Sequence, residues 1–204
     1  DNIAFLSWFQ YGGGKELYDQ LWKEMKRDIK GFMLQPVGPE ALGWFKEPIN
    51  SMDDFRKYRF RTPPGIPGQT YKDIGVASVA MGGGDILPAL EAGTIDAAEW
   101  CCPKPDLVFG FYKVLKNYYL QGLHQVVVNA DLYINGKVWR GLTDHERKAM
   151  EVAADASLSK SMSYRIYENG KALHELTNKH GVILHDTPAD YFPAYMAAAK
   201  ASLE

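Results

Sequence analysis

The chain has 204 residues, of which 46% are hydrophobic, and its formal net charge at pH 7 is −2. This length suits one large domain or two small ones, and the apolar content is sufficient for a substantial core. A nearly neutral chain without a basic run lacks the electrostatic footprint of a nucleic-acid-binding protein. The sequence also contains no apolar stretch of the length that spans a bilayer.

The N-terminal segment opens with an apolar and aromatic run, 3–11, which predicts a strand or another extended segment. Residues 15–30 then predict an amphipathic helix, ended by Gly31, because apolar side chains recur at every fourth position. These apolar positions are Leu17, Leu21, Met25 and Ile29.

Short strands and helices are expected to alternate through the middle of the chain. Ser51 is predicted to cap a short helix whose first turn carries Asp53 and Asp54, since acidic side chains favour that end of a helix. Asp85 is predicted to cap another helix that runs to Ala92. The further strands are expected at 32–36, 58–62, 76–81, 94–100 and 118–120, and further helical segments at 68–74 and 109–115.

The C-terminal third contains the clearest helix signal. Thr143 and Glu146 have the spacing of a capping box, which satisfies two free backbone N–H groups. Apolar residues then recur at every fourth position, so the helix is expected to run unbroken to about Asn178. Such a helix could brace two lobes or pair with a second subunit.

The segments around this helix complete an α/β pattern of alternating strands and helices. Before it, a strand is expected at 125–129, and Asp131 is expected to cap a helix that ends at Trp139. After it, a strand is expected at 182–184. A last helix is predicted to start at Thr187-Pro188, although Pro193 can move that start.

Residue types with reactive side chains are few and poorly spaced for catalysis. The adjacent Cys101 and Cys102 cannot form a disulfide of ordinary geometry and are interpreted as small, half-buried apolar residues. No nucleophile elbow, zinc-protease, C-x-x-C or Walker A motif is present. The histidines lack metal-ligand spacing and are expected at the surface: His124, His145, His174, His180 and His185.

A binding site fits the polar residues better than catalysis does. Glu99 can hold a cation and the adjacent Trp100 can cover an apolar group, which together form a floor for a small ligand. Arg61 precedes the rigid Pro63-Pro64, where a guanidinium could grip a carboxylate with two hydrogen bonds, although most arginines form surface ion pairs. Glu40 and Gln125 add oxygen atoms of the kind that hard cations require, but each alone suits a solvated side chain.

Taken together, these segments resemble the DctP-like solute-binding proteins of tripartite ATP-independent periplasmic (TRAP) transporters. Within that family, the chain resembles the branch that binds 2-oxo acids and related monocarboxylates with a metal ion. The run GGGDILPALEAGTIDAAEW is the most specific match. The other matching segments keep their order and spacing, and they are 11–18, 43–45, 49–51, Arg61, 110–114 and Tyr118-Tyr119.

The resemblance implies an α/β, two-lobed periplasmic-binding-protein-like fold with a ligand cleft and a long lobe-spanning helix. It places the family's carboxylate-binding arginine at Arg61 and its metal-binding acidic residue at Glu99. Trp100 would give the metal a backbone carbonyl and stack its ring on the ligand. Family members are longer at the N-terminus, so residues 1–204 are expected to be the C-terminal portion, with lobe 2 at roughly 10–130 and the remaining lobe 1 elements and the long helix at roughly 131–204.

Two further ligand positions of the branch fall on Glu40 and Gln125. The branch pattern has an amide at the first of these positions and a carboxylate at the second, whereas this chain has the carboxylate first and the amide second. The bound cation could then be Na⁺ or Ca²⁺. Asn129 and the aromatic side chains near 8–11 are weaker candidates for the substrate pocket.

The function implied is capture of a small organic acid, a 2-oxo or 2-hydroxy monocarboxylate bridged to the cation, in the periplasm. The protein would deliver it to membrane permease subunits, would form a homodimer and would need no covalent chemistry. An alternative hypothesis is a metal-assisted hydrolase or lyase for small carboxylic acids, with Glu99 as the base. A purely structural module would leave Arg61, Glu99 and Trp100 without a role.

Overall fold

A computed structural model describes residues 2–203, which fall into two compact units. Unit 1 contains the residues up to Gly38 together with Val127–Ile166, and unit 2 contains Pro39–Val126 together with the residues from Tyr167 onward. Each unit is assembled from two separate stretches of chain. Among residues 2–203, no helix combines the length and the apolar character that crossing a membrane requires.

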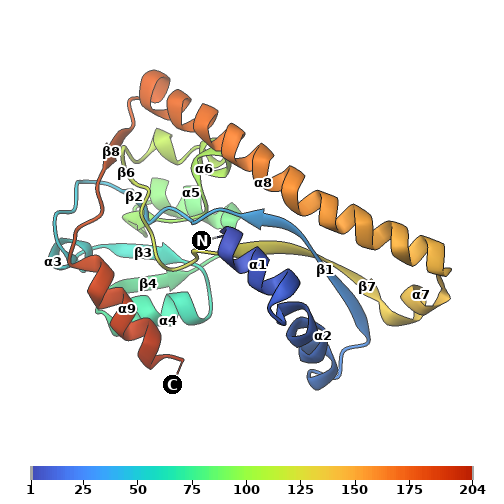
Figure 1. The fold of residues 1–204 in the computed structure, drawn as a ribbon. Coiled ribbons are helices and arrows are strands. Elements are labelled where there is room, and N and C mark those ends of the chain that lie inside the picture. The colour runs from blue at the N-terminus through green and yellow to red at the C-terminus, as the bar shows by residue number, and fades with distance from the viewer. Residues whose placement is uncertain (1, 204) are drawn as a thin grey trace. The chain divides into compact units, whose positions relative to one another are not determined.

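Unit 1 is built on an antiparallel pair of strands that carries the helices of this unit (Figure 1). Its N-terminal segment is a helix, so the predicted strand at 3–11 is wrong. The reason is that the Phe5 ring contacts Trp8 and Phe9, at centroid distances of 5.8 Å and 6.2 Å, and these spacings put the rings on one face of a helix. The elements of unit 1 are α1 (Asn2–Tyr11), α2 (Gly14–Glu24), β1 (Ile29–Val37), β7 (Val128–Asn135), α7 (Gly136–Gly141) and the first part of α8 (Asp144–His180).

Two predicted helices of unit 1 have different bounds in the structure. The helix expected at 15–30 ends at Glu24, because Lys26 adopts a left-handed backbone with φ 54° and Ile29 already pairs in β1. Asp131 lies within β7 and caps no helix. The cap is Asn135 instead, whose side-chain oxygen accepts hydrogen bonds from the first backbone N–H groups of α7.

The long helix α8 is confirmed, and it runs for 37 residues. Its capping box forms as predicted: the Thr143 hydroxyl accepts from the Glu146 N–H at 3.3 Å, and the Glu146 carboxylate accepts from the Thr143 N–H at 2.8 Å. Within unit 1, α8 also supports an irregularity of β1, where a register shift occurs beside Leu34. The Leu34 carbonyl oxygen accepts hydrogen bonds from the hydroxyls of Ser157 and Ser161 in α8, each at 3.0 Å.

Unit 2 is a mixed six-stranded sheet in the order β4-β3-β5-β2-β6-β8, flanked by helices (Figure 1). Its strands are β2 (Gly43–Phe45), β3 (Arg59–Thr62), β4 (Ala77–Ala80), β5 (Ala97–Ala98), β6 (Asn117–Tyr119) and β8 (Ile183–His185). Its helices are α3 (Met52–Phe55), α4 (Ile66–Asp73), α5 (Gly83–Glu91), α6 (Pro103–Phe109), the single 3₁₀ turn η1 (Phe111–Lys113), α9 (Tyr191–Ala201) and the end of α8.

The core of unit 2 consists of two apolar clusters, because neighbouring residues of a strand point to opposite faces of the sheet. Phe45, Ala97 and Tyr119 belong to one cluster, which is packed with side chains of α3, α4 and α9. Their neighbours Trp44, Ala98 and Tyr118 belong to the other cluster, with side chains of α5, η1 and α8. Both faces of this sheet are therefore covered within unit 2.

Local signals in unit 2 were confirmed in part. Ser51 caps α3 by accepting from the Asp54 N–H, as predicted. Asp85 is not a cap, because α5 begins at Gly83 and places Asp85 in its first turn. The last helix begins at Tyr191, not at Thr187, with Pro193 in its first turn, where no intrahelical N–H bond is lost.

Candidate functional site

The sheet topology of unit 2 gathers the predicted polar residues at one edge. β3, β4 and β5 are parallel, so the carboxyl ends that carry Arg61 and precede Glu99 lie together. β2 is antiparallel to β5, which brings the segment before β2, with Glu40, to the same edge. β6 is antiparallel to β2, so its carboxyl end and the following loop with His124 also reach this edge.

The central contact of the site is a buried ion pair. Arg61 Nη1 lies 2.6 Å from Glu99 Oε1, and the two side chains are 5% and 0% exposed. The guanidinium also donates to the Glu99 carbonyl at 2.9 Å and, through Nε and Nη2, to the Met81 carbonyl at 3.1 Å and 2.9 Å. Four of its five N–H groups therefore have partners among the described residues, and one N–H of Nη2 has none. Burial lowers the pKa of Arg61, against the opposing effect of Glu99 and Glu40.

A second group of ligand-type atoms adjoins this pair. His124 Nε2 lies 3.4 Å from Glu99 Oε2 and 3.5 Å from Glu40 Oε2. One ligand atom from each of the three residues lies within 4.8 Å of the others, and all three residues are buried. Among residues 2–203, these two carboxylate oxygens and this nitrogen have no hydrogen-bond partner. We call Glu40, Glu99 and His124 the buried triad.

The ionisation of the triad reflects this crowding. Burial raises the pKa of Glu40, and the nearby Glu99 charge adds to that effect. Burial alone would lower the pKa of His124, but the close carboxylates of Glu40 and Glu99 favour its charged form, outweigh the effect of burial and raise the pKa to about 9. The triad therefore favours a positive charge at its centre.

The other side of the His124 ring is held by two tyrosines. His124 Nδ1 and the Tyr71 hydroxyl are 3.1 Å apart, and the Tyr71 and Tyr191 hydroxyls are 3.2 Å apart. The Leu123 N–H donates to the Tyr191 hydroxyl at 3.1 Å. This buried chain orients the imidazole with Nε2 toward the two carboxylates.

Trp100 lies over the arginine of the ion pair. Its ring centroid is 5.0 Å from Arg61 Cζ, and the ring packs against Phe109 at a centroid distance of 4.8 Å. Gly83 at the start of α5 makes this position possible, because a Cβ there would lie 2.7 Å from the indole. The glycine run therefore has a packing role beside the candidate site.

Asp106 and the cysteines form the buried surroundings. Asp106 accepts hydrogen bonds from Trp44 Nε1 at 2.8 Å, from the Tyr118 hydroxyl at 2.9 Å and from the Cys101 N–H at 3.2 Å. Burial nevertheless raises the pKa of Asp106 to about 7, against the lowering effect of these donors. Cys101 and Cys102 are free and buried, which agrees with their interpretation as small apolar residues.

The structure brings three of the six predicted site residues into direct contact or close proximity: Arg61, Glu99 and Glu40. The ring of Trp100 packs beside them. Gln125 contacts them with its main chain, because its carbonyl accepts a hydrogen bond from the Glu40 N–H at 3.1 Å. The sixth, Asn129, belongs to β7 of unit 1, where its amide donates to Asp131.

His124 is the residue that sequence reasoning missed. All five histidines were expected at the surface, and that prediction is wrong for His124, whose side chain is fully buried. No ligand spacing marks it in the sequence. Its only signal is topological, since the loop after β6 ends at the edge that also holds Glu99.

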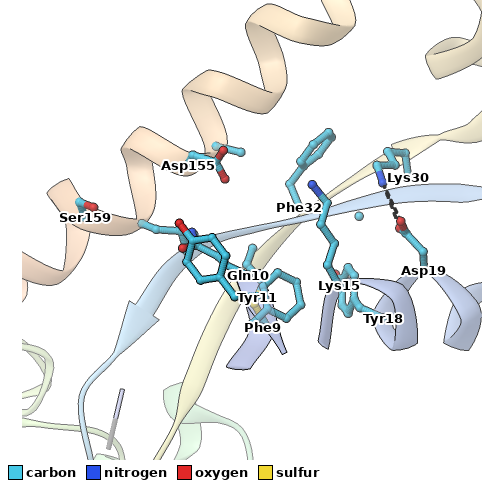
Figure 2. A pocket seen from close by; sticks show the side chains of 14 residues that line it. Phe9, Gln10, Tyr11, Lys15, Tyr18, Asp19, Lys30, Phe32, Asp155 and Ser159 are labelled. Carbon is cyan, nitrogen blue, oxygen red and sulfur yellow. Dashed lines mark hydrogen bonds and ion pairs between the residues drawn. The ribbon is translucent and has the colours of Figure 1, made fainter. Parts of the chain in front are cut away.

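Unit 1 contains a separate pocket with a volume of about 470 Å³, lined by α1, α2, β1 and α8 (Figure 2). Phe9 and Tyr11, two of the weaker aromatic candidates, line it. Its charged side chains are of both signs, and Lys30 pairs with Asp19 at 2.9 Å. The pocket contains none of the residues of the buried triad.

The fold and the site agree with a comparison against known families. Residues 2–203 match the DctP family, described as bacterial extracellular solute-binding protein, family 7, and the chain belongs to this family. The family is one of solute-binding proteins, which does not support the hydrolase or lyase hypothesis.

Comparisons with individual proteins give more specific matches than the family model does. The chain is 30% identical to a monocarboxylate 2-oxoacid-binding periplasmic protein of a Nostoc species, over 83% of this chain and 46% of that protein. It is 31% identical, with a TM-score of 0.87, to a TRAP transporter solute-binding protein of Bordetella bronchiseptica, a dimer with calcium and picolinate. It is 28% identical, with a TM-score of 0.85, to one of Pseudoalteromonas atlantica with sodium and pyruvate.

The two structural alignments cover nearly all of this chain, 96% and 97%, but only 57% and 59% of the other two. The chain thus spans about half to three fifths of the length of these relatives. The likeness confirms the periplasmic-binding-protein fold and the long helix α8.

Proposed function

We propose that this protein is the periplasmic substrate-binding subunit of a TRAP transporter. It captures a small 2-oxo or 2-hydroxy monocarboxylate bridged to a metal cation and delivers it to the membrane permease. The observation that carries this proposal is the buried Arg61–Glu99 pair with the unpartnered oxygens of Glu40 and Glu99 beside it. An anion and a cation can both find a partner of opposite charge there.

The charges of the site support a joint site for anion and cation. A buried charge is costly unless it is paired. Glu40 and Glu99 carry two negative charges when ionised, and Arg61 compensates one of them. Protonated His124 compensates the other until a cation binds and displaces its proton, and the anionic ligand is then attracted by both the cation and the arginine. We assign the free Nη2 N–H of Arg61 to the ligand carboxylate.

The remaining roles follow from position. Trp100 covers the apolar part of the ligand with its ring and supplies a carbonyl oxygen to the cation. Glu40, Glu99 and Gln125 provide further oxygen ligands, which hard cations such as Na⁺ and Ca²⁺ require. Asn129, which lies in β7 of unit 1, stays a weaker candidate for a substrate contact, and we assign units 1 and 2 to the two lobes of the binding protein.

The relatives support the ligand class. Pyruvate and picolinate, which two of them hold, share a carboxylate with a second donor atom on the adjacent carbon. Such a pair chelates a metal ion through two atoms. The Nostoc relative is named for the same class, monocarboxylate 2-oxo acids. The dimer of the Bordetella relative supports a homodimer here.

The test is a tryptophan-fluorescence titration of the metal-stripped protein, since Trp44 and Trp100 lie at or beside the site. Pyruvate and lactate are each added with sodium alone and then with calcium. The expected result is a saturable change that requires a cation. Absence of a response to every small monocarboxylate, whichever metal ion is added, would overturn the proposal.

A further inference from the structure

We infer that Gly83 and Phe109 hold the indole of Trp100 as a fixed wall of the ligand site, and that this wall restricts the ligand to acids with a short tail. The inference rests on the proposed function, because that function places the apolar part of the acid against Trp100. It adds a limit on ligand size and names the two residues that set this limit. Neither residue is assigned a contact with the acid or with the cation.

One side of the indole is set by Arg61. The Arg61 Cζ atom lies 5.0 Å from the centroid of the Trp100 ring. The guanidinium is itself held in place, because it donates to the carboxylate and the carbonyl of Glu99 and to the Met81 carbonyl. Hydrogen bonds of a charged donor are among the strong ones, so the arginine does not yield to the ring. An acid whose carboxylate binds Arg61 therefore has the indole beside it.

The six-membered ring of the indole lies against the first residue of α5. A Cβ on Gly83 would be 2.7 Å from Trp100 Cη2 and 2.9 Å from Trp100 Cζ3. Separations this short do not occur between real side chains, so the indole packs directly on the backbone of Gly83. The ring therefore has no room to move toward α5.

Phe109 supports the indole from the end of α6, and the core of unit 2 supports Phe109. The ring centroids of Trp100 and Phe109 are 4.8 Å apart, and those of Phe109 and Phe111 are 5.7 Å apart. Phe111 is 0% exposed and lies 6.4 Å from the ring of Trp44, which is also 0% exposed. Because protein interiors are close-packed, Phe109 cannot be pushed into this core. A row of aromatic rings thus fixes Trp100 from behind.

These contacts leave Trp100 free only on the side of the ligand. Its side chain is half-buried, and the surface that remains exposed is the surface that the acid would cover. A longer tail cannot push the ring back, since α5 and Phe109 occupy that space. One methylene group more or less in an apolar pocket changes affinity by about 10–200-fold. The structure therefore favours the methyl tail of pyruvate or lactate over propyl and branched tails.

The experiment compares acids that differ only in tail length. Pyruvate, 2-oxobutanoate and 2-oxopentanoate are titrated into the native protein by calorimetry, with sodium and calcium both present. The quantity of interest is the selectivity ratio, which is the affinity for pyruvate divided by the affinity for 2-oxopentanoate. We expect a ratio of at least ~10 in the native protein. Equal or tighter binding of 2-oxopentanoate would overturn the inference.

Two variants should move the wall in opposite directions. Gly83→Ala pushes the indole toward the ligand and should raise the selectivity ratio about 10-fold, whereas Phe109→Leu lets the indole retreat and should lower it about 10-fold. The matched control is Gly84→Ala at the next position of α5, where a Cβ would have no atom within 4 Å. Neither glycine has a left-handed φ, so alanine is compatible with the backbone at both. The control should leave every affinity unchanged.

A ratio of affinities separates a positioning role from a general role in stability, because a loosened fold would weaken the binding of all three acids by the same factor. A Cβ at position 83 would also lie 3.1 Å from Phe109 Cζ, so the two substitutions should compensate each other. The double variant Gly83→Ala/Phe109→Leu is therefore expected to return the selectivity ratio toward the native value. An unchanged ratio in both folded single variants would contradict the inference.

The outcomes also separate this inference from the proposed function. Failure of the native protein to bind any of the three acids would overturn the proposed function, and the size limit with it. Pyruvate binding with a ratio that neither single variant moves would overturn only the roles of Gly83 and Phe109. Pyruvate binding with ratios that shift in opposite directions in the two variants would support both.

Discussion

Arg61 Nη1 donates to Glu99 Oε1 at 2.6 Å, and neither side chain is more than 5% exposed. The same guanidinium holds the carbonyl of Met81 after β4 and that of Glu99 after β5. Arg61 therefore ties together the carboxyl ends of three parallel strands as well as compensating a buried charge. Its structural role and its proposed binding role depend on the same atoms.

Replacement of this arginine should affect both binding and stability. Arg61→Ala leaves Glu99 as a buried charge without its partner, so we expect abolished monocarboxylate binding and a loss of about 3–5 kcal/mol in the free energy of unfolding. Ligand titration and urea denaturation measure the two effects. The control is Arg59→Ala on the same strand, whose exposed pair with Asp96 at 2.8 Å should contribute far less to stability because solvent screens it. Monocarboxylate affinity retained in Arg61→Ala would contradict the assignment.

The buried carboxyl group of Asp106 should make stability depend on pH. Burial raises its pKa from 3.8 to about 7. The contribution of the neutral carboxyl group to folding stability is therefore fully present below pH 3.8. As the pH rises to about 7, the unfolded chain ionises first and this contribution is lost. Relative to Asp106→Asn, the native protein should lose on the order of 4 kcal/mol across this window and nothing further above it.

Urea unfolding of both forms at several pH values, in metal-free buffer, checks this expectation. The comparison between the two forms removes the titration of all other groups. A difference in unfolding free energy that is constant from pH 4 to pH 8 would show that Asp106 has no raised pKa.

Gly43 should tolerate no side chain. Its φ is 133°, and a Cβ would lie 2.6 Å from the Ala98 carbonyl, next to Glu99 at the site. We expect Gly43→Ala to destabilise the protein by about 1–3 kcal/mol. Gly170→Ala in α8 is the matched control, since nothing lies within 4 Å of a Cβ there and alanine favours the helix by about 1 kcal/mol. Thermal unfolding of both variants should shift in opposite directions, and a shared direction would refute the argument.

The capping box of α8 should contribute measurably to stability. Thr143→Ala removes the hydroxyl that accepts from the Glu146 N–H, and we expect a loss of about 0.5–2 kcal/mol in the free energy of unfolding. Ser163→Ala is the control, because its exposed hydroxyl donates to a carbonyl of the same helix, that of Ser159. A loss as large in Ser163→Ala as in Thr143→Ala, in urea denaturation, would show that the cap is not the cause.

Signals that involve only near neighbours could be predicted. The Ser51 cap, the Thr143–Glu146 box and the length of α8 are interactions over a few residues, and the structure confirms them. The segment 3–11 could not be assigned in this way. Its aromatic residues suit strand and helix alike, and the contacts of Phe5 with Trp8 and Phe9 appear only in the folded helix.

By itself, the sequence determined the family, through the long specific run 82–100, and it placed Arg61, Glu40 and Glu99 at ends of predicted strands or in loops. It determined neither that Arg61 pairs directly with Glu99 nor that His124 is buried beside them. Those facts depend on the order β3-β5-β2-β6 in the sheet, which joins residues far apart in the chain. Burial and charge pairing act through space, so only the tertiary structure could decide them.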